Sequence, residues 1–352
     1  MLLTVIIILS SSLLLLEVSG VRSKSLFSIP LLLLWLTFSF NRYNSDYLDY
    51  SNLFENVNAT SSFEVGYGLF VKLLSYFGFG HDVIIFIVGS LLLYVIFKES
   101  KGARYSNLII LMYCLSPLFF DLNQIRNTLM YLIVILSLAF IVPKKPVEYY
   151  LGICLAFLFH KFAIVYLPLY YLNSLSRKKF LWLIIFGLTF LFSTSPLIMH
   201  ILTWFMPSKM NAYLAREPGL GVLVVFVYVL LDLLTIWWVD QRVRKRASLS
   251  DKRRFEVMYR FLWLSVLILP FTFYFLEVKR MQRNAMLVKY IYSVVAMKYM
   301  TASEKIITTI LLLISALLPI FIMLYNGEIS DIKDIDQNLL LHYFGFYKRE
   351  GV

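Results

Sequence analysis

Residues 106–142 read SNLIILMYCLSPLFFDLNQIRNTLMYLIVILSLAFIV, and this stretch decides the fold class. Two apolar runs, 106–120 and 128–142, flank a short polar cluster that contains Asp121, Gln124 and Arg126. Each run supplies most of a helix that crosses a hydrocarbon layer about 30 Å thick. An arginine beside hydrocarbon costs about 2.5–3.5 kcal/mol at a helix centre and therefore indicates a functional site. The alternatives are a snorkelling side chain and a structural ion pair with Asp121.

The same alternation of apolar runs and polar connections extends along all 352 residues, which are 60% hydrophobic and 15% charged. Soluble domains are nearer a quarter charged, so this composition excludes a soluble globular chain, a disulfide scaffold and a disordered tail. We expect an all-α polytopic membrane protein, a single integral membrane domain over 1–352 with about 10–12 transmembrane or re-entrant helices. Because the first run lacks a positive n-region, we interpret it as a retained helix rather than a signal peptide. The apolar segments are 2–18, 26–40, 83–97, 106–120, 128–142, 149–172, 180–203, 219–239, 257–276, 284–297 and 306–325.

The net charge of +12 fits basic cytoplasmic loops better than a nucleic-acid partner. Most basic residues fall in five connections that we place on the cytoplasmic side: 22–24, 98–104, 144–145, 177–179 and 242–254. Three apolar segments separate 144–145 from 242–254, and three crossings would put these loops on opposite sides. We therefore predict that 149–172 is a re-entrant helical hairpin with a break near His160 and Lys161. An unrecognised hairpin elsewhere would correct the parity equally well.

The largest exterior loop, 41–81, alternates acids with aromatic residues, a combination that suits sugars because carboxylates accept hydroxyl hydrogen bonds and rings pack on C–H faces. An interfacial loop rich in tyrosine is the alternative. Among its acids Glu64 is favoured, because it stands where the chain turns back toward the membrane. The acids are Asp46, Asp49, Glu55 and Glu64, and the aromatic residues are Tyr43, Tyr47, Tyr50, Phe54, Phe63 and Tyr67.

Two more polar positions are candidates. His160 lies in an apolar run and is either a packing residue or a proton acceptor at the hairpin apex. Arg280 and Arg283 are three residues apart on a predicted helix face, where two planar forks match a diphosphate; anionic lipid headgroups are the alternative ligand. The sequence contains no P-loop, HExxH, metal-spaced His/Cys cluster or G-x-S-x-G, so we expect no metal and no cofactor.

Taken together, these residues resemble the EpsG-like branch of the bacterial Wzy polysaccharide polymerases. The resemblance rests on an Arg-Tyr-x-x-x-Asp-Tyr-x-x-Tyr stretch, a Glu-x-Gly-Tyr stretch, a Gln-x-Arg stretch, a Phe-His pair and a late exterior arginine. The chain departs from the family pattern at Asn127, where Gln is more common, and at Ser45, where Gly is more common. The matching residues are Arg42, Tyr43, Asp46, Tyr47 and Tyr50; Glu64, Gly66 and Tyr67; Gln124 and Arg126; Phe159 and His160; and Arg280 or Arg283.

The resemblance implies a GT-C-like glycosyltransferase, multi-pass in the bacterial inner membrane, that joins oligosaccharide repeat units at the outer face. Donor and acceptor would both be linked to undecaprenyl diphosphate, and a chain-length regulator would be a further partner. Diphosphate binding is assigned to Arg126, Arg280, Arg283 and Arg42; the catalytic base to His160, Glu64 or Asp46; and sugar binding to Tyr47, Tyr50, Tyr67 and Gln124. The alternatives are a flippase for the lipid-linked unit, an O-antigen ligase and, from another class, a membrane O-acyltransferase.

Overall fold

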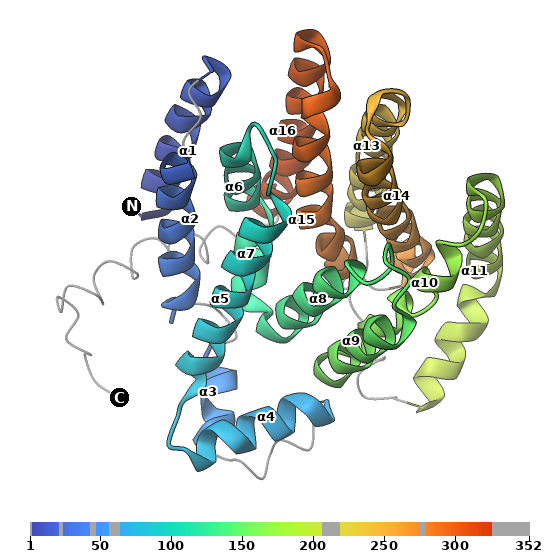
Figure 1. Ribbon diagram of the computed structural model, residues 1–352. Helices are drawn as coiled ribbons and strands as arrows, with labels where there is room; N and C mark the ends of the chain where they lie inside the picture. The colour runs from blue at the N-terminus through green and yellow to red at the C-terminus, as the bar shows by residue number, and fades with distance from the viewer. Residues whose placement is uncertain are drawn as a thin grey trace.

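The computed structural model describes residues 2–20, 24–42, 47–55, 64–205, 219–274 and 279–325, and the regular structure in these ranges is entirely helical (Figure 1). This confirms the all-α fold class. The first half contains α1 (Leu2–Val18), α2 (Lys24–Ser39), α3 (Tyr47–Glu55), α4 (Val65–Tyr76), α5 (His81–Glu99), α6 (Ser106–Leu115), α7 (Pro117–Asn123), α8 (Ile125–Leu138) and α9 (Pro146–Phe159). The second half contains η2 (Lys161–Tyr166), α10 (Leu169–Leu172), α11 (Arg177–Phe205), α13 (Gly219–Arg246), α14 (Leu249–Leu264), η3 (Ser265–Phe273), α15 (Lys279–Ala296), η5 (Met297–Tyr299) and α16 (Ala302–Tyr325).

Within the described residues, four helical stretches are long and apolar enough to cross a membrane. They are His81–Glu99, Arg177–Ile201, Leu249–Phe273 and Ala302–Pro319. The bent pair α6 and α7 makes a fifth if it counts as one span, and six more apolar helical stretches are 10–17 residues long. The chain is therefore a polytopic membrane protein, while the total of about 10–12 spanning or re-entrant helices stays a prediction.

The polar cluster of residues 121–127 lies on a doubly broken helix. Pro117 starts α7, where its missing N–H costs no intrahelical bond, and the axis bends by 60° between α6 and α7. Gln124 then leaves the helical region of backbone space, with φ −118° and ψ 58°, so α8 starts at the next residue. These breaks place Arg126 in the first turn of α8 rather than in the middle of a long helix.

The expected break near His160 is confirmed. Helix α9 ends at Phe159, and His160 is extended, with φ −157° and ψ 126°, before η2 begins. The Tyr149 hydroxyl donates to the Tyr166 carbonyl at 2.6 Å, although 17 residues separate the two. A straight helix would put these residues about 25 Å apart at 1.5 Å per residue. The chain therefore turns back on itself, as a helical hairpin requires.

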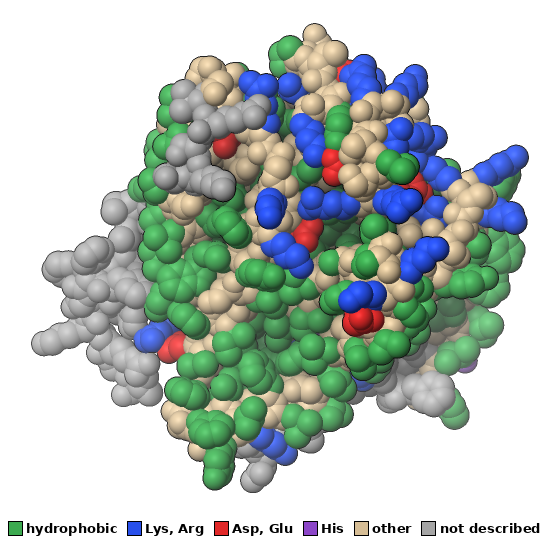
Figure 2. Space-filling model, viewed as in Figure 1, with side chains coloured by type: hydrophobic (Ala, Val, Ile, Leu, Met, Phe, Trp, Pro, Cys, Tyr) green, Lys and Arg blue, Asp and Glu red, His purple; other side chains and the backbone are tan. Residues whose placement is uncertain are grey.

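Several loops that we expected on the cytoplasmic side lie together. Arg177 pairs with Asp240 at 2.7 Å, and Arg254 pairs with Glu99 at 2.8 Å. Lys and Arg side chains gather over the upper part of the molecule in Figure 2, whereas α3 and α4 lie at the lower end in Figure 1. The loops 98–104, 177–179 and 242–254 thus share one end of the bundle. We refer to it as the basic end.

Helix α15 is the central helix, in contact with α6, α13, α14 and η3. It contains a fully buried lysine that the sequence did not single out. The Lys289 ammonium contacts the Asp232 carboxylate of α13 at 2.5 Å and also donates to the Ser315 hydroxyl of α16. Ser315 donates to the same carboxylate at 2.8 Å. A buried charge is tolerated only when it is paired and hydrogen-bonded, so this cluster locks α13, α15 and α16 in one register.

We expect the substitution Lys289→Met to destabilise the protein by about 3–5 kcal/mol, because it leaves the Asp232 carboxylate buried without its cation. The double variant Asp232→Asn/Lys289→Met should recover most of that loss, since the asparagine carbonyl still accepts from Ser315. The stability of both variants is measured by heating the detergent-purified proteins and following the loss of the folded peak by size-exclusion chromatography. A double variant no more stable than Lys289→Met would contradict this account.

Candidate active site

The centre of the candidate site is the Arg126 guanidinium. Its Nη1 contacts a Glu64 carboxylate oxygen at 2.5 Å, and its Nε donates to the Tyr50 hydroxyl at 3.0 Å. The rings of Tyr50 and Tyr67 lie 5.7 and 5.6 Å from the guanidinium carbon, within cation–π range. The side chains of Arg126 and Glu64 remain 23% and 14% exposed. Several contacts thus hold the pair, which is still partly accessible, and the alternative interpretation, an ion pair between Arg126 and Asp121, is wrong.

Asp121 pairs instead with Arg283, at 3.1 Å, and both side chains are buried. Its other carboxylate oxygen accepts from the hydroxyls of Tyr113 and Tyr131, at 2.7 and 2.5 Å. This cluster joins α6, α7, α8 and α15 directly behind the first turn of α8. Asn127 and Asn284 add a reciprocal amide pair between α8 and α15, at 2.8 and 3.3 Å. The polar cluster of the sequence therefore has a buried face that fixes α8 and an accessible face that presents Arg126.

A chain of aromatic and charged contacts leads from Arg126 to the surface. The His81 ring stacks on Tyr50, with centroids 5.2 Å apart, and lies 5.4 Å from Tyr47. The Tyr47 hydroxyl donates to Asp82 at 2.7 Å, and Arg42 pairs with the same carboxylate at 2.7 Å. Arg42, Tyr47, Tyr50, Glu64 and Tyr67 therefore converge on one region, although they come from different helices and connections. The structure shows that these residues lie together, and the roles assigned to them stay predictions.

His81 and Asp82 were missed in the sequence. They begin α5 immediately after Gly80, at the end of the exterior loop. Two polar residues at the point where this loop enters a helix could have been recognised from the sequence as candidates. His81 is buried, and neither of its ring nitrogens has a hydrogen-bond partner among the described residues. Its contribution to the region is therefore the stack on Tyr50 rather than a hydrogen bond.

The hairpin apex also packs against this region. Helix α4 crosses α9, and an added Cβ at Gly66 would lie 2.5 Å from the Leu158 Cβ, so only glycine permits this approach. Phe70 packs edge-on against Phe159 at 5.9 Å. His160 Nδ1 accepts from the backbone N–H of Phe162 at 3.3 Å, so the neutral ring has its proton on Nε2. Nδ1 therefore acts as a base only after giving up this hydrogen bond.

The remaining predicted site residues have different surroundings. Tyr67 is fully buried, and its ring makes a cation–π contact with Arg126. The backbone carbonyl of Gln124 accepts from the Thr128 backbone N–H. Arg280 lies in the first turn of α15, and its side chain is outside the described part of the structure. Asp46 also lies outside the described residues.

A family model described as the EpsG family matches residues 24–339, nearly the whole chain. This match confirms the resemblance suggested by the short motifs. No curated protein and no solved structure matches the chain.

We expect Gly66→Ala to displace α4 from α9 and to move Glu64, two residues away, relative to Arg126. The matched control is Gly80→Ala, because nothing lies within 4 Å of a Cβ at that position. A cysteine cross-link between α4 and α9 should form less efficiently in the Gly66 variant and normally in the Gly80 variant. Equal cross-linking in the two variants would show that α4 accommodates the methyl group.

We expect Arg283→Ala to reduce the yield of folded protein, because it strands the buried Asp121 carboxylate at a cost of about 3–5 kcal/mol. Arg126→Ala should leave the folded yield nearly unchanged, since Glu64 is partly exposed and can be hydrated. Size-exclusion profiles of the two variants, expressed in parallel, separate these roles. The reverse order of yields would overturn the distinction between the buried and the accessible arginine.

Proposed function

This chain belongs to the EpsG family of Wzy-like polysaccharide polymerases, and we propose that it joins undecaprenyl-diphosphate-linked oligosaccharide repeat units at the outer face of the bacterial inner membrane. The observation that supports this proposal best is the accessible Arg126–Glu64 pair set among Tyr50 and Tyr67. It provides a cation for a diphosphate and a carboxylate for a sugar hydroxyl in one place. The pair lies at the end of the bundle opposite the basic end, where an exterior reaction would occur.

The first role is to stabilise the leaving group. In the proposed step, the acceptor hydroxyl oxygen bonds to the anomeric carbon of the donor, and the bond from that carbon to the diphosphate oxygen breaks. Negative charge develops on the departing lipid diphosphate, and a preoriented guanidinium stabilises that charge more in the transition state than in the ground state. Arg126 suits this role because Tyr50 and Tyr67 fix its orientation from behind. Arg280 and Arg42 are further candidates for the second phosphate.

The second role is to accept the proton of the attacking hydroxyl. In our proposal the diphosphate replaces the Glu64 carboxylate as the partner of Arg126, and the released carboxylate accepts that proton. His160 is the alternative base, through the Nδ1 atom that accepts from the Phe162 N–H. Asp46 stays a third candidate. The lipid diphosphate and the lengthened chain are then the two products.

The third role is to bind the sugars. The surface contacts from Arg42 through Asp82 to Tyr47 supply charged and aromatic groups beside the reacting centre. Because the Tyr67 ring is buried against Arg126, we assign it to positioning that arginine rather than to stacking on sugar. The same reasoning makes Arg283 a positioning residue that holds α7 and α15 together through Asp121.

We expect Arg126→Ala to reduce polymer formation by about 10²–10³-fold, as the loss of one preoriented donor typically does. The measurement is a gel of cell-surface polysaccharide from a host in which the gene is deleted and replaced by each variant. A ladder that collapses to a single repeat unit on its acceptor indicates that export continues and polymerisation has failed. Arg253→Ala, an exposed arginine near the basic end, is the matched control and should retain the ladder.

Two outcomes of this experiment contradict the proposal. If the deletion removes even the single repeat unit from the surface, the flippase or ligase alternative replaces the polymerase. If Arg126→Ala supports a normal ladder at a normal protein level, the accessible pair is not the centre of the reaction.

A further inference from the structure

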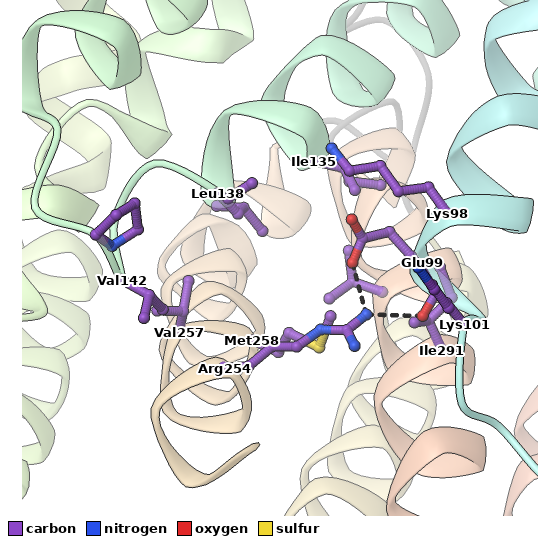
Figure 3. A pocket seen from close by; sticks show the side chains of 13 residues that line it. Lys98, Glu99, Lys101, Ile135, Leu138, Val142, Arg254, Val257, Met258 and Ile291 are labelled. Carbon is purple, nitrogen blue, oxygen red and sulfur yellow. Dashed lines mark hydrogen bonds and ion pairs between the residues drawn. The ribbon is translucent and has the colours of Figure 1, made fainter. Parts of the chain in front are cut away.

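A pocket lined by both charged and apolar side chains lies at the basic end, away from the Arg126–Glu64 pair. Its volume is about 570 Å³, within the usual size range of small-molecule sites. Its charged residues come from the end of α5, the turn that follows it and the start of α14, and its walls come from α8, α14 and α15 (Figure 3). The lining residues used below are Lys98, Glu99, Lys101, Arg254 and the apolar residues Ile135, Leu138, Val257, Met258, Val288 and Ile291.

The charges of the pocket do not cancel. The Arg254 guanidinium donates to the Glu99 carboxylate at 2.8 Å and to the Glu99 carbonyl at 2.7 Å, so this pair neutralises itself. Lys98 lies above the Tyr94 ring, and neither Lys98 nor Lys101 has a carboxylate partner among the described residues. Two formal positive charges therefore remain at the mouth, which fits an anion with a compact head.

The rest of the pocket is apolar and lies deeper in the bundle. Along α14, Val257 and Met258 follow Arg254 by one helical turn, so the wall changes from charged to apolar over about 5.4 Å. Leu138 and Ile135 form the facing wall from α8, and Ile291 and Val288 come from α15. A free phosphate would make no favourable contact with this apolar wall. Burying a hydrocarbon chain against it would instead contribute about 25 cal/mol of binding free energy for each Å² of apolar surface that is buried.

We propose that this pocket binds one anionic glycerophospholipid. The phosphate lies between Lys98 and Lys101, and an acyl chain lies along the wall of α8, α14 and α15. The location at the basic end favours a phospholipid over the lipid-linked sugar substrate, because basic loops face the leaflet that is rich in anionic headgroups. The site would tie the loop 98–104 to α14 and α8 when the lipid is bound. It is independent of the proposed polymerase reaction.

The test is native mass spectrometry of the full-length, detergent-purified protein titrated with short-chain phosphatidylglycerol. We expect one saturable adduct, and we expect Lys98→Gln/Lys101→Gln to weaken it by about 25-fold, at about fivefold for each lysine near a headgroup. The matched control is Lys178→Gln/Lys179→Gln, which removes the same charge from exposed positions at the same end. The control should weaken binding less than twofold.

Three further probes decide the occupant. Phosphatidylcholine with the same chains should bind at least tenfold more weakly, and binding equal to that of phosphatidylglycerol would overturn recognition of an anionic head. Glycerophosphoglycerol, which has no chains, should not compete, and full competition would exclude a role for the apolar wall. Farnesyl phosphate should bind more weakly than phosphatidylglycerol, and tighter binding would replace the phospholipid by a polyprenyl phosphate. If both double lysine variants lost the same amount of phosphatidylglycerol binding, the general surface charge would explain the binding, and the pocket would not be a specific site.

Discussion

The architecture depends on the buried Asp121 carboxylate. One oxygen faces the Arg283 guanidinium, and the other accepts from Tyr113 and Tyr131, so groups from α6, α8 and α15 converge on one residue of α7. In a bundle surrounded by lipid, little hydrophobic driving force acts between helices, and directional polar contacts contribute much of the specificity. Because α7 and α8 are separated by the break at Gln124, the contacts that Asp121 makes with Tyr131 and Arg283 help to fix the orientation of α8, together with the packing of α8 on α5 and α9. Asp121 thus contributes to the position of the helix that carries Arg126, while Glu64 and Tyr50 orient the guanidinium itself.

The large features of the fold could be predicted from the sequence because hydrophobicity and charge act over long stretches. The apolar segments correspond to helices, and the odd number of segments between two basic loops indicated the hairpin that breaks at His160. Charge parity is a strong constraint, since an arginine-rich loop has a high cost on the wrong side. The loop 98–104 likewise joins the 242–254 loop through Arg254 and Glu99.

The partners of individual residues could not be predicted, because pairing depends on distances between helices that periodicity does not encode. Arg126 was considered beside its sequence neighbour Asp121, yet its partner is Glu64, which comes from the start of α4. Lys289 was hidden in an apolar run whose average hydrophobicity tolerates one charge, and its partners come from α13 and α16. Tyr67 was assigned to sugar on the basis of its residue type, and burial gives it a different neighbour. In each case the sequence identifies the residue type but not the neighbours that surround it in the fold.

The hairpin formed by α9, η2 and α10 has a consequence for how such proteins diverge. Since the chain enters the hairpin after Pro143 and leaves it before Arg177, both at the basic end, an insertion or deletion inside it leaves the direction of every later helix unchanged. A change of one full crossing would instead invert everything downstream and place the basic loops on the wrong side. A change in the length of the hairpin therefore does not by itself invert the helices that follow it.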